Sequence, residues 1–349
     1  MTDSLPSIVC FSTVVKSPRR EESDGTALPT RPKVLLVDDH PDILKSTSRL
    51  LSFDFEIVGT ARDGYQAVDA AQRLDPDLIA LDITMPGRDG FQTAQDLVQL
   101  GSRAPIVFLT MHESDDYVAE GFRSGGRGYV LKTRLHLDLA TALRRVLAGQ
   151  LFVPSLKGLL AIDPDFTGHV VHFHEDDRGF VDGVSGLIAA ALRRGDAVSL
   201  VTKPHLRAGV AQRLQALGWN VGQTGRFGAY SALDSETALA PILQDGQLNI
   251  DRMRELVAET ERGRTNGSRG ADSILTFVGD VSTYLLEVDP QLAVELEHAW
   301  NDVTQPLRFL TVCCYPTPRF DGTNAHWFPE LCNQHIAVSH LSESMSRSA

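Results

Sequence analysis

Four short apolar runs, each followed at once by a polar or charged side chain, constrain this chain more than any other feature. The runs VLLV, LIAL, PIVFL and GYVL precede Asp38, Asp82, Thr110 and Lys132. Runs this short and this continuously apolar are typical of parallel strands that are buried on both faces of a sheet. Because parallel strands end at the same edge of their sheet, we expect the four side chains to meet in one crevice.

Amphipathic patterns separate these runs. Segment 41–51 opens with a proline in its first turn, and segment 135–147 repeats leucine at helical spacing. The alternation of strand and helix implies right-handed crossovers and a doubly wound α/β fold. The predicted helices cover 41–51, 66–74, 90–100, 115–123 and 135–147.

The predicted crevice has the chemistry of a phosphoryl acceptor. Asp38, Asp39 and Asp82 would repel one another, and a Mg²⁺ ion relieves such repulsion with oxygen ligands and bound water. Asp82 would attack phosphorus as a nucleophile and form an acyl phosphate. Lys132 and the metal would neutralise the phosphoryl oxygens, and the Thr110 hydroxyl would reach them by hydrogen bonding.

The motifs around this crevice resemble the receiver domain of two-component response regulators. VLLVDDHP, LDITMPGRDG, VFLTMH and GYVLKT occur in that family's order and spacing. The resemblance implies a flavodoxin-like, five-stranded parallel sheet. It also implies these roles by position: Asp82 as phosphoacceptor, Asp39, Asp82 and the Thr84 carbonyl as Mg²⁺ ligands with Asp38 acting through water, Thr110 and Tyr129 as the switch pair, and Lys132 as the phosphate-bridging lysine. The alternative is a flavodoxin-like fold with incidental acids, which the joint placement of these side chains disfavours.

Length, composition and charge bound the rest of the molecule. The 349 residues include 42% hydrophobic ones, and the mean hydropathy is −0.10, which suits two globular domains. No apolar run is long enough to cross a bilayer, so we expect a cytoplasmic protein without a membrane partner. The four cysteines are too unevenly placed for a disulfide framework. A net charge of −12 argues against a nucleic-acid partner.

Composition changes divide the chain. The regulators that this receiver resembles continue into a helix-turn-helix, but here strand–helix alternation resumes instead. A linker is indicated by Gly158, Pro164 and two aspartates. The predicted parts are a disordered tail at 1–31, the receiver domain at 32–150, a linker at 151–167, a second domain at 168–340 and a disordered tail at 341–349.

The second domain repeats the strand–helix alternation. HVVHFH, AVSLVT, ILTFVGDV and FLTVCCYP are strand-like, and helical patterns cover 180–194, 203–217, 235–243, 250–261 and 291–303. This order predicts a three-layer sandwich of the RecA-like, KaiC-like or Rossmann-like kind. GHVVHFHED, ALRRGDAVSLVTKPHL, LEHAWNDV and LTVCCYP resemble the MEDS domain, the sensory domain of methanogen and methylotroph regulators such as the dichloromethane-responsive repressor. The resemblance implies that the domain senses a small molecule.

A ligand of the second domain is expected at the carboxyl ends of its strands. The candidate ligand crevice consists of His174, Glu175, Lys203, Asp280 and Tyr315. The structural alternative is that Lys203 starts a helix, Asp280 caps one and Tyr315 closes a core. The turn EDDRGF carries acids where a RecA-like ATPase needs glycines and a lysine, so ATP hydrolysis is not expected.

Histidines and cysteines also permit a metal interpretation. His172 and His174 share one face of a strand, and Cys332 with His335 is compatible with one helical turn, so four ligands could assemble. No CxxC pair supports this set, and ordinary packing or hydrogen-bonded histidines is the favoured interpretation. The adjacent cysteines of LTVCCYP are expected to pack as small hydrophobic residues.

These observations predict a response regulator, a phosphoprotein in phosphorelay signal transduction that is not an enzyme apart from slow autodephosphorylation. A sensor histidine kinase or a phosphotransfer protein would donate the phosphoryl group to Asp82, and the MEDS-like domain would bind a small molecule or another protein. Phosphorylation would move Thr110 and Tyr129 and alter a face suited to a homodimer. Two alternatives stay open: a transcription regulator with an unrecognised DNA reader, and a degenerate RecA-like nucleotide-binding domain.

Overall fold

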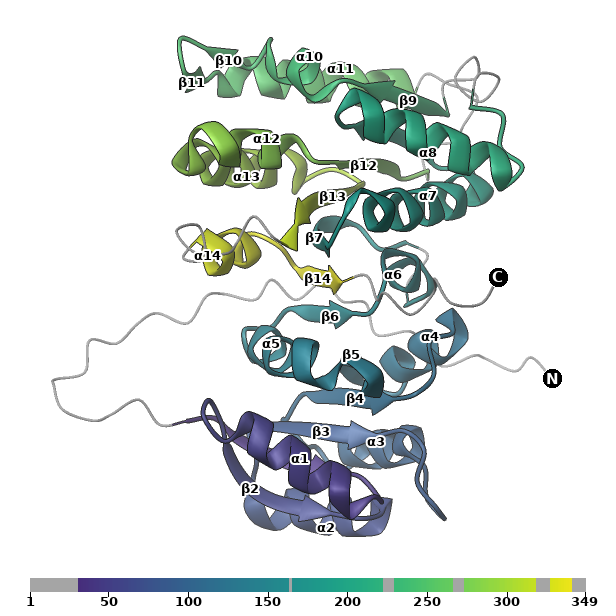
Figure 1. Cartoon of the computed structure of the whole chain (residues 1–349), viewed down its shortest axis with the longest axis vertical. Helices are drawn as coiled ribbons and strands as arrows, with labels where there is room; N and C mark the ends of the chain where they lie inside the picture. The colour runs from purple at the N-terminus through teal and green to yellow at the C-terminus, as the bar shows by residue number, and fades with distance from the viewer. Residues whose placement is uncertain (1–30, 163–164, 222–228, 266–272, 318–326, 341–349) are drawn as a thin grey trace, which may run out of the picture. The chain divides into compact units, whose positions relative to one another are not determined.

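One parallel β-sheet runs through the described part of the chain (Figure 1). The structure is a computed structural model that describes residues 31–162, 165–221, 229–265, 273–317 and 327–340. All pairings within this sheet are parallel. In sheet order its strands are β2 (Glu56–Ala61), β1 (Lys33–Val37), β3 (Leu78–Asp82), β4 (Ile106–Thr110), β5 (Gly126–Leu131), β6 (Leu151–Val153), β14 (Ala337–His340), β7 (Gly168–His174), β13 (Phe309–Pro316), β12 (Leu275–Gly279), β8 (Ala197–Val201) and β9 (Tyr230–Leu233).

The helices of the first half, up to residue 150, cover both faces of strands β1 to β5. They are α1 (Pro41–Leu51), α2 (Gly64–Leu74), α3 (Gly90–Gln99), α4 (Asp115–Arg123) and α5 (Leu135–Leu147). Leu51 of α1 and Leu143 of α5 share one core cluster, whereas Ala67, Ala94 and Val118 of α2 to α4 belong to another. The strand order β2-β1-β3-β4-β5 is the flavodoxin-like one, so the predicted doubly wound fold of this half is confirmed.

Local signals set where helices begin beside the strand ends. The Asp63 and Asp89 carboxylates cap α2 and α3 by accepting the N–H groups of Gln66 and Gln92, each at 2.8 Å. A Cβ atom at Gly90 would collide with the backbone carbonyl at the end of β3, so glycine is needed where α3 starts. These features fix where α2 and α3 begin beside the strand ends.

The predicted linker at 151–167 requires a correction, because it contains β6 and the helix α6 (Leu156–Ile162). Its apolar residues explain the difference, since Phe152, Leu156 and Leu159 are buried. β6 pairs with β5 on one side and with β14 on the other, so it joins the strands of the two halves. The other domain limits stay a prediction, and the tails predicted at 1–31 and 341–349 lie outside the described residues except for Arg31.

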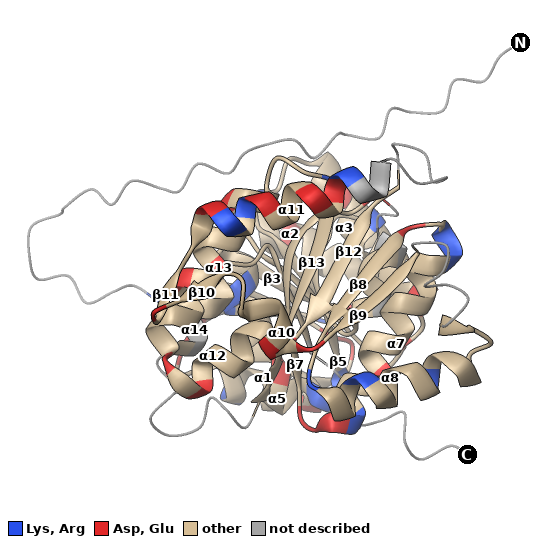
Figure 2. Ribbon diagram, turned by 90° about the horizontal axis from the view of Figure 1, so that it is seen from above, with Lys and Arg blue, Asp and Glu red and all other residues tan. Residues whose placement is uncertain are grey.

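The second half, from residue 168, is also built from strands and helices. Figure 2 shows α7 and α8 on one side of the sheet and α12 and α13 on the other. The parallel α/β character of this half is observed, whereas the RecA-like, KaiC-like or Rossmann-like three-layer class stays a prediction. Its helices are α7 (Asp177–Arg194), α8 (Pro204–Ala216), α10 (Ser235–Leu239), α11 (Ile250–Thr265), α12 (Val281–Val288), α13 (Pro290–Thr304) and α14 (Trp327–Asn333).

Two elements of the second half differ from the prediction. The helix predicted at 235–243 ends at Leu239 and is followed by the hairpin β10 (Leu243–Gln244) and β11 (Gln247–Leu248). The run ILTFVGDV is a strand only as far as Gly279, after which α12 begins. Among the described residues, no helix has an apolar stretch long enough for a bilayer.

Candidate functional site

The carboxyl ends of β1, β3 and β5 bring two buried acids and a lysine together. Lys132 Nζ lies 2.7 Å from Asp38 Oδ2 and 2.8 Å from Asp82 Oδ2. Asp38 and Asp82 are each 1% exposed. We call these three residues the acid–lysine cluster. Two anions share one cation in it, so a further positive charge placed beside the acids would be favourable.

Burial and charge set the protonation of the acid–lysine cluster. Burial raises the pKa of Asp82, and the Lys132 ammonium only partly offsets this rise. Burial by itself would lower the pKa of Lys132, but its bonds to Asp38 and Asp82 outweigh burial and raise that pKa. Lys132 therefore stays protonated, and a cation placed against Asp82 would favour the ionised carboxylate.

Asp39 and Thr84, the other predicted metal ligands, flank the cluster. The Asp39 side chain is partly exposed, and its Oδ1 lies 2.7 Å from His40 Nδ1. The Thr84 N–H donates to Asp82 Oδ1 at 3.2 Å. Sequence reasoning missed His40, which also approaches Asp38 with Nδ1 3.7 Å from Oδ1. Its place directly after the acid pair is the signal that could have indicated it.

The predicted switch pair lies buried next to α4. Thr110 and Tyr129 are both fully buried. Thr110 Oγ1 accepts the His112 N–H at 3.0 Å, and the Tyr129 hydroxyl donates to the His112 carbonyl at 2.9 Å. The His112 ring stacks on Tyr117 of α4, with ring centroids 4.2 Å apart. A movement of Thr110 would therefore reach α4 through this short segment.

Helix α4 in turn packs against α6, which leads into the second half. A Cβ atom at Gly158 of α6 would lie 3.3 Å from Val118 Cγ1 of α4, so the two helices approach closely. Phe122 of α4 packs against core clusters of both halves. Helix α6 also contacts α7. A continuous set of packed helices thus connects the first half to the second.

A cavity of about 350 Å³ lies in the second half, beside β8, β12 and β13 and helices α10 to α13. Small-molecule sites in proteins have volumes of this order. Sequence reasoning missed this cavity because it lies over the middle of the sheet as well as at the strand ends. Most of its wall is apolar, and the side chains include Val201, Met253, Phe277, Leu296, Trp300 and Val312, with the polar Glu297 and Cys313.

The five residues predicted as a ligand crevice do not line this cavity: His174, Glu175, Lys203, Asp280 and Tyr315. Asp280 is buried and accepts the Ser235 hydroxyl at 2.9 Å, and burial raises its pKa. Lys203 Nζ lies 3.4 Å from Glu287 Oε1. Both therefore contact other elements of the second half, Asp280 with Ser235 of α10 and Lys203 with Glu287 of α12.

The remaining predicted crevice residues also bond to protein groups. The Tyr315 hydroxyl donates to Glu297 at 2.5 Å in the core. His174 Nδ1 lies 3.0 Å from a backbone carbonyl in the turn before α7. Glu175 lies 3.7 Å from Arg134 of the first half. All five residues therefore make contacts within the protein, and their role as a ligand crevice stays a prediction.

The possible metal ligands of the second half, His172, His174, Cys332 and His335, do not form one group either. Alternation along β7 places His172 and His174 on the face covered by α7, where His174 lies edge-on to Phe180 with ring centroids 5.3 Å apart. His335 packs instead against His169 on the other face, with ring centroids 4.1 Å apart. Among the described residues, no compact group of metal-ligand side chains contains His172, His174 or Cys332.

The chain is similar to bacterial response regulators. The nitrate/nitrite response regulator protein NarL of Escherichia coli (strain K12) is 36% identical over 120 residues, which are 34% of this chain and 56% of NarL. The oxygen regulatory protein NreC of Staphylococcus haemolyticus is 28% identical over 185 residues, which are 52% of this chain and 82% of that protein. This chain therefore spans little more than half of NarL.

Solved structures include a similar protein. A two-component response regulator of the LuxR family from Aurantimonas sp. SI85-9A1 is 29% identical, with a TM-score of 0.34. The similarity covers 35% of this chain and 89% of that one.

Two domain families match the chain in succession. Residues 34–144 match the response regulator receiver domain. Residues 168–327 match the MEDS domain, the MEthanogen/methylotroph, DcmR Sensory domain. The acid–lysine cluster and the switch pair lie within the first match, and the cavity lies within the second. This chain therefore contains a response regulator receiver domain followed by a MEDS domain.

Proposed function

We propose that this protein is a two-component response regulator that accepts a phosphoryl group on Asp82. The observation that carries the proposal is the buried Asp82 carboxylate 2.8 Å from the Lys132 ammonium, beside the buried Asp38. An Asp82 oxygen would attack the phosphorus of a phosphohistidine on a sensor kinase or phosphotransfer protein. The P–N bond would break, and its electron pair would return to the histidine ring, which takes up a proton. Lys132 would neutralise a phosphoryl oxygen.

The donor set of the acid–lysine cluster and its neighbours fits Mg²⁺. Carboxylates are hard oxygen ligands, and Asp38, Asp39 and His40 already form a compact group. By the family's pattern, Asp39, Asp82 and the Thr84 carbonyl would hold the ion, and Asp38 would act through water. The ion, when bound, supplies positive charge beside the transferring phosphoryl group.

The output would pass through α4 and α6. The Thr110 hydroxyl, which now accepts the His112 N–H, would turn to the phosphoryl group. His112 would follow, and with it Tyr117 of α4. Because α4 packs on α6, α6 would transmit this change to the MEDS domain. A homodimer formed through α4 would have to accommodate α6 at the same face.

The MEDS domain would bind a small, mainly apolar molecule in its cavity, which supports a sensory output. A DNA-binding output has less support. Figure 2 shows acidic and basic residues interspersed along α11, where Arg252 pairs with Glu255 and Arg254 with Asp251, each at 2.9 Å. Such a helix lacks the clustered positive charge that phosphate contacts require.

Acetyl phosphate tests the phosphoacceptor role directly. Incubation with acetyl phosphate and Mg²⁺ is expected to add the mass of one phosphoryl group to the intact protein, and Asp82→Asn is expected to abolish this addition because amide nitrogen and oxygen do not form the acyl phosphate. Asp69→Asn, a change at an exposed acid of α2, is the matched control. Equal labelling of wild type and Asp82→Asn would refute the assignment.

The α4–α6 contact can be uncoupled from phosphorylation. Gly158→Val is expected to push α6 away from Val118, because even a Cβ atom there is already at 3.3 Å. Asp82 should still be phosphorylated, but the phosphorylation-dependent change in hydrogen exchange of the MEDS domain should vanish. This corresponds to losing a coupling free energy of about 0.5–2 kcal/mol between phosphorylation and the MEDS domain. Hydrogen–deuterium exchange with and without acetyl phosphate measures it.

A valine at another helical glycine provides the control for this substitution. A Cβ atom at Gly186 of α7 would meet no atom within 4 Å, so Gly186→Val should leave the coupling intact. An exchange difference that persists in Gly158→Val would show that the signal takes another path.

A further inference from the structure

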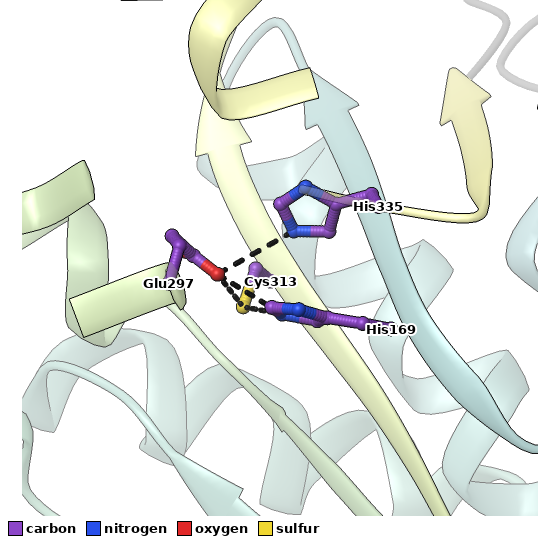
Figure 3. A group of neighbouring side chains, drawn as sticks. All are labelled: His169, Glu297, Cys313 and His335. Atoms are coloured by element: carbon purple, nitrogen blue, oxygen red, sulfur yellow. Dashed lines mark hydrogen bonds and ion pairs between the residues drawn. The ribbon is translucent and has the colours of Figure 1, made fainter. Parts of the chain in front are cut away.

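Four side chains that can bind a metal converge in the second half of the chain (Figure 3), and two of them, Glu297 and Cys313, line the cavity. His169 comes from β7, Glu297 from α13, Cys313 from β13 and His335 from the segment before β14, and their ligand atoms all lie within 4.8 Å of one another. His169 Nε2 is 3.0 Å from Glu297 Oε2 and 3.1 Å from Cys313 Sγ. Glu297 Oε2 is 3.4 Å from Cys313 Sγ and 3.6 Å from His335 Nε2.

Both histidines are held with Nε2 facing the centre of this group. The Asn301 amide nitrogen donates to the Gln334 carbonyl at 2.6 Å, which leaves Asn301 Oδ1 facing His169 Nδ1 at 3.1 Å. His335 Nδ1 donates to the Leu331 carbonyl at 2.7 Å. Each Nδ1 therefore donates outward, and each Nε2 is the nitrogen that would offer its lone pair to a metal at the centre. Metal-binding histidines are held in the same way by an outer acceptor.

The Nε2 atom of His335 indicates that hydrogen bonds within this group do not satisfy all of its buried polar atoms. His335 is 3% exposed, and this nitrogen makes no hydrogen bond with any part of the chain that the structure describes. A buried acceptor without a donor is costly. A metal at the centre of the group would take up its lone pair.

Glu297 and Cys313 supply the negative charge. Glu297 is 1% exposed, and its Oε1 accepts the Tyr315 hydroxyl, so Oε2 is the oxygen left for the centre. Burial raises the pKa of the Cys313 thiol, and the adjacent Glu297 raises it further. As a metal–sulfur bond forms, the proton of the Cys313 thiol would leave to solvent, and thiolate and carboxylate would together balance two positive charges.

We propose that His169, Glu297, Cys313 and His335 bind one divalent transition-metal ion, with Zn²⁺ as the expected species. Two imidazoles, a thiolate and a carboxylate are ligands that zinc accepts, and its bonds of about 2.0–2.3 Å place tetrahedral ligands roughly 3.3–3.7 Å apart. The four distances of 3.0, 3.1, 3.4 and 3.6 Å given above lie near this range, and all the ligand atoms lie within 4.8 Å of one another. Because Glu297 and Cys313 also line the cavity, the ion would be part of the cavity wall. This proposal does not rest on Asp82 being the phosphoacceptor.

Cobalt titration of the full chain tests the proposal. The protein is stripped with a chelator and titrated with Co²⁺ in excess Mg²⁺, so that Mg²⁺ competes for the oxygen ligands around Asp82. We expect one Co²⁺ per chain, with the intense visible bands of tetrahedral cobalt and a thiolate-to-cobalt charge-transfer band. One equivalent of Zn²⁺ should remove both. Folded wild-type protein without these bands would show that the four side chains form only a hydrogen-bonded network.

Substitutions assign the ligands. Cys313→Ser should abolish the charge-transfer band and weaken Zn²⁺ binding by at least about 100-fold. Cys314→Ser, at the next residue on the opposite face of β13, should keep the band and the affinity. Asn301→Ala should keep the band but weaken Zn²⁺ binding by about 10–100-fold, so the outcome does not depend on one variant folding. Identical spectra for wild type and Cys313→Ser would overturn the proposal.

Discussion

Lys132→Ala is expected to slow the phosphorylation of Asp82 by acetyl phosphate by about 10²–10³-fold, the usual loss when one preorganised donor is removed from a transition state. The Lys132 ammonium lies 2.8 Å from Asp82 and 2.7 Å from Asp38, so it is placed to neutralise a phosphoryl oxygen. Without it, burial would raise the pKa of Asp82 with no lysine to oppose the rise, and less of the carboxylate would be ionised. Mass spectrometry over time, at fixed Mg²⁺, measures the rate.

Lys203→Ala is the matched control for this substitution, because Lys203 also pairs with an acid, Glu287, but lies in the MEDS domain. Its phosphorylation rate should equal that of the wild type. A second measurement guards against misfolding: Mg²⁺ should raise the melting temperature of Lys132→Ala more than that of the wild type, since the variant has lost the cation that the buried acids share. A phosphorylation rate within a few-fold of the wild type would refute the role of Lys132.

The sequence predicts the receiver fold well because its signals are local. Each buried parallel strand is a continuous apolar run, and each run stops where a polar side chain takes over. Asp38, Thr110 and Lys132 therefore mark strand ends in the sequence as they do in the structure. The meeting of these ends then follows from the topology of a parallel sheet. The proximity of Lys132 to both buried acids was predictable for that reason.

Segments whose structure depends on distant partners were harder to predict. β6 and α6 are short, and Phe152 and Leu156 are buried only because strands and helices from both halves surround them. Helix α12 follows β12 without a loop, so ILTFVGDV looks like one strand. Glu297 was missed as well, although an acid on the apolar face of a helix, next to Leu296 and near Trp300, is a signal of a buried charge.

The strand face explains why the four possible metal ligands in the sequence, His172, His174, Cys332 and His335, differ from the group that the structure brings together. His172 and His174 were grouped because they share a face, and the structure confirms that they do. His169 lies an odd number of residues away from both on an approximately straight strand, so it points to the other face with Cys313 and Glu297. Which face meets α13 cannot be read from the strand alone, because it depends on the order of the whole sheet.

The junction between the domains ends beside the proposed metal site. The Gln150 side-chain amide donates to the backbone carbonyls of Cys332 and His335, at 2.5 and 2.6 Å. Arg145 of α5 bonds to Asn333 in the same segment at 3.3 Å. A shift of α5 or β6 on phosphorylation would therefore act on the backbone of His335. Phosphorylation and metal binding would be thermodynamically coupled if both depend on this segment.

Glu297→Ala is expected to lower the free energy of unfolding of the metal-free protein by roughly 3–5 kcal/mol. The substitution leaves the buried Tyr315 hydroxyl and the buried His169 without the carboxylate that they contact. The Glu297 carboxylate accepts the Tyr315 hydroxyl and lies 3.0 Å from His169. Burial raises the pKa of Glu297, but His169, His335 and Ser282 together outweigh burial, so the pKa lies well below its usual value. A carboxyl group whose pKa is lower in the folded state than in the unfolded state stabilises the fold at pH values above its unfolded-state pKa. This contribution is lost as the pH falls through the folded-state pKa.

Urea unfolding in the presence of chelator measures this loss, at neutral pH and in steps towards acid. Glu295→Ala is the matched control, since Glu295 is exposed on the same helix two residues away, and it should change stability by less than about 0.5 kcal/mol. The difference between wild type and Glu297→Ala should hold down to the ordinary pKa of glutamate and shrink only in stronger acid. A difference below about 1 kcal/mol at neutral pH, or one that disappears near pH 5, would mean that His169 and Tyr315 do not depend on an ionised Glu297.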